Sequence, residues 1–307
     1  MKILNQKNKA FSIFEISITI FIIGILIAGI SNGADLYQDY RFISARQQTN
    51  NSIVGRIKGL SLWFETTSEK SFEKANPLNN EPISKWKNLS FQESNSLNVF
   101  QNDSDYQPKY IENAINNLPA LNFNDGIKYL ISDPINYSEI SDIENMTLFF
   151  VTRSMGGPVG INPAPFFAFA EKDSNGTEVF RNQLYLYHQN KILFQYGNLC
   201  GASVSFIYNT CRATVSSLNP KHPNNNFIVT TVKSKDVGKI YINSIIETIN
   251  PLHTDKYPQT NIKFPFYIGS VGRSSLNFTG ELIMFNRTLT DKEIESVHNY
   301  LRSKWKI

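Results

Sequence analysis

Three patterns of hydrophobic and polar positions follow one another along the chain. The first ten residues are polar and basic, and residues 11–30 are almost wholly apolar. Residues 31–58 space their apolar side chains several positions apart. From residue 59 onward, short apolar or alternating runs are separated by Asn, Asp, Gly, Pro and Ser. The two N-terminal apolar patterns predict a helix, and the third predicts strands joined by turns.

The apolar segment at residues 11–30 is long enough to cross a membrane. Its twenty residues would span about 30 Å as a helix, the thickness of the bilayer hydrocarbon. Lys2, Lys7 and Lys9 precede it, so we expect its N-terminal end to stay in the cytoplasm and the rest of the chain to cross. A secretory signal peptide, cut near residues 31–34, and a plain membrane anchor are the alternatives.

Glu15 places a carboxylate inside this apolar segment. An unpaired carboxylate in lipid is costly, so an intramembrane acid indicates a function. Neither a signal peptide nor a plain anchor explains it.

Beyond the span, amphipathic spacing predicts that the helix continues to a boundary near Lys58 and Gly59. Gly55 and Gly59 weaken its far end. The apolar positions are Leu36, Tyr37, Tyr40, Ile43, Ile53, Val54 and Ile57.

The remainder of the chain predicts an antiparallel β-sandwich followed by a short helix. Thr290 and Glu293 fit a helix capping box, after which four apolar residues up to Trp305 fall on one face. The fold class is therefore α+β, with a long N-terminal helix, a sandwich and a C-terminal helix. The strand-like runs are 60–64, 120–123, 147–151, 183–187, 227–232, 239–243, 266–269 and 280–285.

Composition supports an ordered, strand-rich domain. Charged residues make up 18% of the chain, which argues against disorder, and aromatic residues make up 13%, which suits strands. The net charge of +4 lies partly in the first ten residues, and no basic stripe is present elsewhere, so we expect no nucleic-acid partner.

Cys200 and Cys211 are the two cysteines. A metal site would need further Cys or His close by. In an exported domain the two would form a disulfide, worth about 2–3 kcal/mol. Two free buried thiols are the alternative.

The residues around the start of the apolar segment resemble the leader junction of type IV prepilins and pseudopilins. That junction has a small residue before the cut, Phe after it, and Glu four positions further on. The resemblance implies cleavage between Ala10 and Phe11 by prepilin peptidase, and N-methylation of the new Phe11 amine. Ala10 stands where Gly is usual, and Ser12 where Thr is common. The matching run is Lys9-Ala10-Phe11-Ser12-Ile13-Phe14-Glu15, followed by the apolar residues 22–28.

This resemblance gives Glu15 a role. Glu15 of one subunit would pair with the Phe11 amine of a neighbour, which neutralises two costly charges and sets the axial register. The implied partners are prepilin peptidase, other pilin or pseudopilin subunits and the inner membrane. The sandwich would lie on the periplasmic or extracellular side and, after processing, in a pilus or pseudopilus. Surface pili, secretion pseudopili and DNA-uptake filaments share this motif.

The C-terminal part resembles the laminin-G-like, concanavalin A-like jelly roll. The chain then divides into a leader at 1–10, a helix at 11–58 and a sandwich at 59–307. The family usually has an Asp-rich turn after a Trp that corresponds to Trp86, and residues 86–90 lack that turn. The matching segments are 59–63, 118–126, 149–151, 240–243, 266–269, 280–290 and the closing helix to Ile307.

Calcium is the one cofactor that this resemblance implies. The family often binds it at loop oxygens, and Asp125 in Asn124-Asp125-Gly126 is the candidate ligand. We favour the alternative, a plain Asp-Gly turn between strands.

No catalytic motif stands out. Paired carboxylates would suit glycan hydrolysis, but the nearest acids, Glu171 and Asp173, adjoin a predicted turn at residues 174–176. Gly269 to Arg273 follows a strand without opening a helix, so we expect no phosphate site there. The four histidines, His188, His222, His253 and His298, show no metal-ligand spacing, and we expect His298 to be a surface or packing residue.

Two functions follow from these patterns. The first is a non-enzymatic minor pilin or pseudopilin-like subunit that displays its sandwich for adhesion, by binding a glycan or a protein. The alternative is a membrane-tethered glycan hydrolase, or a glycan-binding module that is not assembled into filaments.

Overall fold

The computed structural model divides the chain into two compact units, residues 1–43 and 44–307. The described residues are 12–90, 97–136, 145–154, 165–172, 178–189, 191–198, 212–216, 225–235, 237–251, 263–269 and 277–307.

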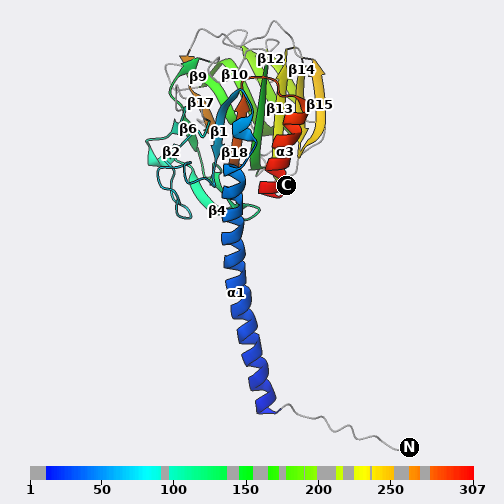
Figure 1. Cartoon of the computed structure of the whole chain (residues 1–307). Helices are drawn as coiled ribbons and strands as arrows, with labels where there is room; N and C mark the ends of the chain where they lie inside the picture. Colours follow the sequence, from blue (N-terminus) through cyan, green and yellow to red (C-terminus); the bar gives the residue numbers. More distant parts are fainter. Residues whose placement is uncertain are drawn as a thin grey trace, which may run out of the picture. The chain divides into compact units, whose positions relative to one another are not determined.

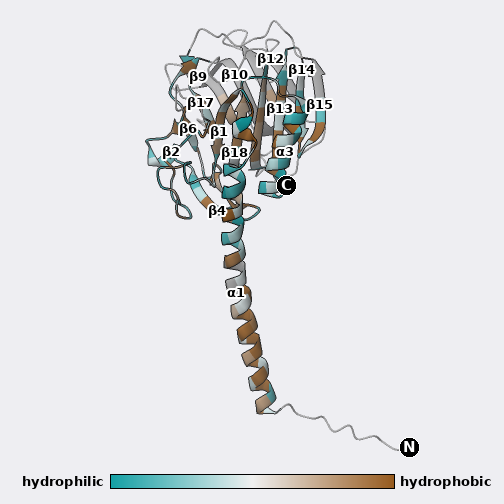
Figure 2. Ribbon diagram, in the orientation of Figure 1, coloured by the Kyte–Doolittle hydropathy of each residue, from teal (hydrophilic) through white to brown (hydrophobic). Residues whose placement is uncertain are grey.

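The first helix, α1 (Ile13–Asn50), carries the apolar segment. Residues Ile13–Ile30 have a mean hydropathy of 2.5, and none of them is buried. In Figure 2 most of the ribbon over this stretch has the brown colour of hydrophobic residues. A helix of this length and composition can cross a membrane, as a membrane anchor or as a signal sequence does.

The helix ends at Asn50 rather than continuing to Lys58. The Ser52 N–H donates to the Thr49 carbonyl at 3.1 Å and closes the last turn. A 3-10 turn, η1 (Val54–Arg56), follows, and it buries Val54 in the second compact unit. The apolar spacing of Val54 and Ile57 therefore reflects packing against the sandwich and not a continued helix.

Gly59 turns the chain into the first strand. Its φ of +85° lies in the left-handed region, and a Cβ there would meet the Asn286 side chain. Its carbonyl accepts from the Asn286 N–H at 2.8 Å, which fixes the start of the strand.

The first sheet has the order β15–β14–β13–β8–β18–β5–β4 among the described residues, and β1 also pairs with β18. All of these pairings are antiparallel. The strands are β1 (Leu60–Glu65), β4 (Lys109–Ile115), β5 (Leu118–Asn122), β8 (Asn145–Ser154), β13 (Asn226–Ser234), β14 (Val237–Ile242), β15 (Ile245–Pro251) and β18 (Asn277–Phe285).

The second sheet has the order β12–β11–β10–β9–β17–β6–β3–β2 within the described ranges, and it is also antiparallel. The predicted antiparallel sandwich is confirmed (Figure 1). The strands are β2 (Lys85–Trp86), β3 (Val99–Phe100), β6 (Tyr129–Ile131), β9 (Pro165–Lys172), β10 (Glu178–Gln189), β11 (Lys191–Asn198), β12 (Arg212–Ser216) and β17 (Phe266–Gly269). A separate pair, β7 (Ile135–Asn136) with β16 (Lys263–Phe264), and a 3-10 turn, η2 (Ser104–Tyr106), complete the unit.

The central strands of the first sheet are buried on both faces. Along β18, Leu282 and Met284 join the core between the sheets, while Ile283 and Phe285 join a second core on the opposite face. This double burial explains why β18 reads as an apolar run and not as an alternating strand.

The C-terminal helix α3 (Asp291–Trp305) covers that second core, and Figure 1 shows it alongside the first sheet. Thr290 and Glu293 form the predicted capping box. Arg287 donates to Glu293 at 3.0 Å. With the cap hydrogen bonds, this contact lowers the pKa of Glu293 to about 2. The apolar face expected from the sequence is confirmed, since Ile294, Val297, Leu301 and Trp305 are all buried.

Candidate functional site

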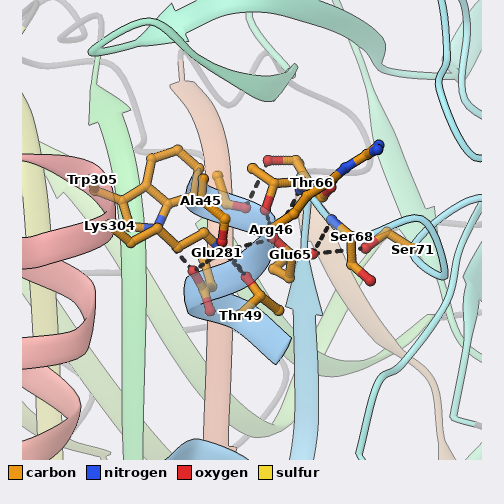
Figure 3. Close-up of polar contacts among 12 residues, drawn as sticks. Ala45, Arg46, Thr49, Glu65, Thr66, Ser68, Ser71, Glu281, Lys304 and Trp305 are labelled. Carbon is orange, nitrogen blue, oxygen red and sulfur yellow. Dashed lines mark hydrogen bonds and ion pairs between the residues drawn. The ribbon is translucent and has the colours of Figure 1, made fainter. Parts of the chain in front are cut away.

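A lysine and two glutamates meet in the interior of the second compact unit. Lys304 comes from α3, Glu65 from the end of β1 and Glu281 from β18. The Lys304 Nζ lies 2.7 Å from Glu65 Oε2 and 2.9 Å from Glu281 Oε2, and all three side chains are fully buried. We call these three residues the buried charge cluster (Figure 3).

The carboxylate of Glu281 is saturated with donors. Its Oε1 accepts from Trp63 Nε1 and from the Tyr300 hydroxyl, each at 2.8 Å. Its Oε2 accepts from Trp305 Nε1 at 2.8 Å, beside the contact with Lys304. Two indoles and a phenol thus bring both apolar packing and hydrogen bonds to one buried acid.

The carboxylate of Glu65 is held by the turn that follows β1. Its Oε2 accepts from the Thr67 N–H at 2.8 Å and the Thr67 hydroxyl at 2.7 Å. Its Oε1 accepts from the Ser68 N–H and, at 3.3 Å, from the Ser71 hydroxyl. In Figure 3, Ser68 and Ser71 lie on the side of Glu65 away from Lys304.

Lys304 also ties the end of α1 to α3. Its Nζ donates to Thr49 Oγ1 at 2.8 Å and lies 3.2 Å from the Tyr300 hydroxyl. The last turn of α1, two strands of the first sheet and α3 therefore converge on one ammonium group.

The electrostatics favour the charged forms of the lysine and of Glu65. Burial raises the pKa of Glu65, but the Lys304 charge and the hydrogen bonds outweigh this, so the net pKa is lowered. Burial lowers the pKa of Lys304, but the Glu281 and Glu65 charges outweigh this and raise it. Burial and these acids raise the pKa of Tyr300 well above its usual value, so the phenol stays a donor.

This arrangement suits structure better than catalysis. Each carboxylate is fully buried and occupied by protein donors, so neither presents an acid or base to a substrate. The buried charge cluster instead fixes four elements in one geometry, because Lys304 on α3 contacts α1, β1 and β18, and its removal would leave two buried carboxylates without their cation.

The sequence analysis missed this cluster. Glu65 and Glu281 each stand next to apolar strand residues, and Lys304 stands beside Trp305 on the buried face of a helix. A charged residue on an otherwise apolar face is the signal that would have found them. The pairing of Glu65 with Lys304 joins residues more than two hundred positions apart, and no local pattern reveals it.

A pocket of about 540 Å³ lies beside the cluster in the same compact unit. Arg56, Lys70 and Lys87 contribute cationic side chains to its lining, and no carboxylate lines it among the described residues. We call it the cationic pocket. The amide residues Asn50, Asn88 and Asn98, together with Thr49, Ser52, Gly55, Trp63, Ser68 and Leu89, complete its lining.

The wall of the cationic pocket rests on the buried charge cluster. Trp63 lines the pocket and donates its indole N–H to Glu281. Ser68 lines it and donates its backbone N–H to Glu65. Asn88 Oδ1 accepts from the Trp63 N–H at 2.8 Å, which holds the two sides of the wall together.

Glu15, predicted as an assembly residue, lies in the first turn of α1. Its Oε2 accepts from the Ser12 N–H at 2.8 Å, while the Ser12 hydroxyl accepts from the Phe14 N–H at 3.1 Å. Within one chain Glu15 thus helps to cap the helix, an arrangement the sequence analysis did not anticipate although Ser12 and Glu15 have capping-box spacing. Ala10 and Phe11 lie outside the described residues.

Asp125 lies in an exposed turn, and its Oδ2 is 2.7 Å from the Lys109 Nζ. That hydrogen bond and the Lys109 charge lower the pKa of Asp125. In the described part of the chain, no group of three or more His, Cys, Asp or Glu residues is placed to hold a metal ion. Calcium binding at Asp125 stays a prediction.

Several predicted features lie outside the described residues. They are Cys200 and Cys211 with their disulfide, Asp173, His222, His253 and residues 270–273. Glu171 lies in β9 and His188 lies in β10, and the structure describes only the backbone of these two residues.

His298 packs inside the protein. It is 1% exposed, its Nε2 lies 2.9 Å from the Thr230 hydroxyl, and its ring meets Phe149 and Tyr241 edge-on. Burial, then the charge of Arg302, lowers its pKa to about 4, so it is neutral at pH 7.

Comparison with solved structures shows the fold. The binding domain of Paraclostridial Mosquitocidal Protein 1 superposes with a TM-score of 0.53 at 12% sequence identity. That match covers 78% of this chain but only 52% of the other, so the chain spans about half the length of that structure. No family model matches the sequence, and no curated protein matches it.

Two further solved structures superpose less well on this chain. The binding domain of botulinum neurotoxin serotype G has a TM-score of 0.47 at 12% identity, covering 73% of this chain and 52% of the other. A Trypanosoma rangeli sialidase in complex with sialic acid has a TM-score of 0.46 at 13% identity, covering 80% and 33%.

Proposed function

We propose that this protein is a minor pilin or pseudopilin-like subunit that displays a ligand-binding β-sandwich. One observation carries the proposal, namely a carboxylate near the start of a membrane-length apolar helix that continues into a compact sandwich unit. Glu15 follows Phe11 by four positions, at the spacing of the prepilin junction. In this proposal prepilin peptidase cuts after Ala10, and the Phe11 amine, once methylated, is the cationic partner of a neighbour's Glu15.

The physical argument rests on charge in lipid. After cleavage the new amine and Glu15 would both lie in an apolar environment, where each alone is costly. Pairing between subunits offsets that cost only in the correct axial register. The pair would therefore specify assembly more than it adds stability.

The sandwich is the part proposed to bind a ligand. The cationic pocket is within the size range of pockets that hold small ligands, and it combines charged and amide side chains suited to a polar molecule. The carboxylates of Glu65 and Glu281 do not reach solvent, so these two residues supply no acid or base to a ligand in the pocket. Turnover of polysaccharides by the purified full-length protein would favour the hydrolase instead.

The assembly role of Glu15 is tested by two substitutions. Glu15→Gln keeps a side-chain acceptor for the Ser12 N–H but removes the charge, whereas Glu15→Leu removes both. If the charge sets the register, both variants should be processed normally and be depleted about tenfold or more from sheared filaments. Normal incorporation of Glu15→Gln would mean that the residue only caps the helix.

A further inference from the structure

The cationic pocket carries three positive side chains and no negative one among the described residues that line it. Arg56 and Lys70 are exposed and Lys87 is half-buried, so their charged ends can be reached from solvent. None of the three makes an ion pair in the described part of the chain. Nearby lysines differ, since Lys74 lies 3.0 Å from Glu81 and Lys85 lies 4.0 Å from Glu73.

Three like charges around one concavity are unfavourable unless a counter-charge enters. Their mutual repulsion falls when an anion binds, and charge-assisted hydrogen bonds then form from the ammonium and guanidinium groups. A concave site also screens these charges less than a flat surface does. The pocket is therefore complementary to an anionic ligand.

Amide side chains in the lining narrow the class of anion. Asn98 Oδ1 accepts from the Asn88 N–H at 3.0 Å, and within the described residues the Asn98 amide nitrogen donates to no protein acceptor. Asn50 also lines the pocket, at the end of α1. Amides both donate and accept, as is needed to bind hydroxyl groups, whereas a bare phosphate calls only for donors.

Hydrogen bonds hold the Asn88 and Trp63 side of the pocket lining in place. Asn88 is fixed by hydrogen bonds to Trp63 and Ser61, and Trp63 is fixed in turn by Glu281. A preformed wall lowers the ordering cost of binding. The buried charge cluster therefore acts as the support of the pocket.

We propose that the cationic pocket binds an acidic saccharide, one or two sugar rings carrying a carboxylate or sulfate group. This deepens the ligand-binding role proposed above and rests on it. The anionic group is placed against Lys70 and Lys87, and the hydroxyl groups against the amides. Duplex DNA suits the pocket less, because its phosphates call for an extended basic surface and not a single small concavity.

The test measures binding to the full-length protein in a non-ionic detergent without a sugar headgroup. Digalacturonate is compared with its methyl ester, which has the same rings and no charge, and N-acetylglucosamine 6-sulfate with N-acetylglucosamine. The acidic member of at least one pair should bind about tenfold or more tightly than its neutral partner, and less tightly as salt is raised.

The variant Lys70→Gln/Lys87→Gln should lose about tenfold or more of that affinity. The matched control Lys58→Gln/Lys292→Gln removes the same charge from two exposed side chains outside the lining, and should leave affinity unchanged. Equal loss in both variants, or none in the pocket variant, would overturn the assignment. Inorganic phosphate or a short DNA duplex binding as tightly as the saccharide would also overturn it.

The outcomes separate this inference from the proposal it rests on. Binding of neutral saccharides alone would overturn the acidic assignment and leave the ligand-binding role intact. Absence of binding to any saccharide would overturn this inference, whereas the ligand-binding role, which also allows a protein ligand, would stand. Filament assembly does not enter the measurement, so failure of the pilin-like role would not disturb the result.

Discussion

At the scale of residues, the buried charge cluster constrains the geometry of the sandwich unit. Lys304 pairs with both Glu65 and Glu281, and all three side chains are fully buried. A buried ion pair adds little net stability compared with apolar residues, but breaking one is costly because a charge is left unpaired. The cluster therefore acts as a constraint on geometry.

Replacement of Lys304 by Met should destabilise the protein by about 3–5 kcal/mol, since two carboxylates would remain buried without their cation. The matched control is Lys292→Met, which removes an exposed lysine from the same helix and should change stability by no more than about 0.5 kcal/mol. The free energy of unfolding from urea titration measures both. Equal effects would contradict the structural role of the cluster.

His298 should make stability depend on pH in a defined window. Its pKa falls from 6.5 to about 4 on folding, so below pH 6.5 the unfolded chain binds a proton that the folded chain does not. The contribution of the neutral His298 to stability is fully present above pH 6.5. It declines as pH falls toward 4, by roughly 2–3 kcal/mol. Subtracting the profile of His298→Gln isolates the effect, and parallel profiles would contradict it.

At the scale of elements, the sequence predicted those parts of the fold that local patterns determine. The capping box at Thr290 located α3, and apolar runs located β1 and β18. The end of α1 was placed too late because Val54 and Ile57 pack against the sandwich while η1 replaces the helix.

The sequence patterns did not predict which elements pair with one another. Strand β18 pairs with β8, β5 and β1, which come from three separate parts of the chain. The cationic pocket likewise combines the end of α1 with loops around β1 and β2. Such sites depend on long-range packing that no periodicity in one segment encodes.

The contact between β18 and α3 depends on Gly280. A Cβ at this position would overlap the ring of Trp305, whose indole N–H donates to Glu281 at 2.8 Å. Gly280→Ala should therefore destabilise the protein by about 1–3 kcal/mol. In a double-mutant cycle with Trp305→Leu, the cost of the alanine should largely vanish, because the obstructing ring is gone. Additive effects in urea unfolding would contradict the steric explanation.

At the scale of the whole molecule, one chain combines a helix suited to a membrane with a domain suited to binding a ligand. An apolar helix of membrane length bears an acid near its start, and a compact β-sandwich carries a polar pocket. The proposal that links them requires the leader to be removed, because only cleavage creates the amine that Glu15 would pair with.

Mass spectrometry of the mature protein isolated from cells tests this central claim most directly. The account predicts a chain that begins at Phe11 and carries an N-methyl group on that residue. A mature chain that begins beyond Ile30 would identify the apolar helix as a removed signal sequence, and one that retains its first ten residues would identify a plain anchor. Either result would contradict the filament role.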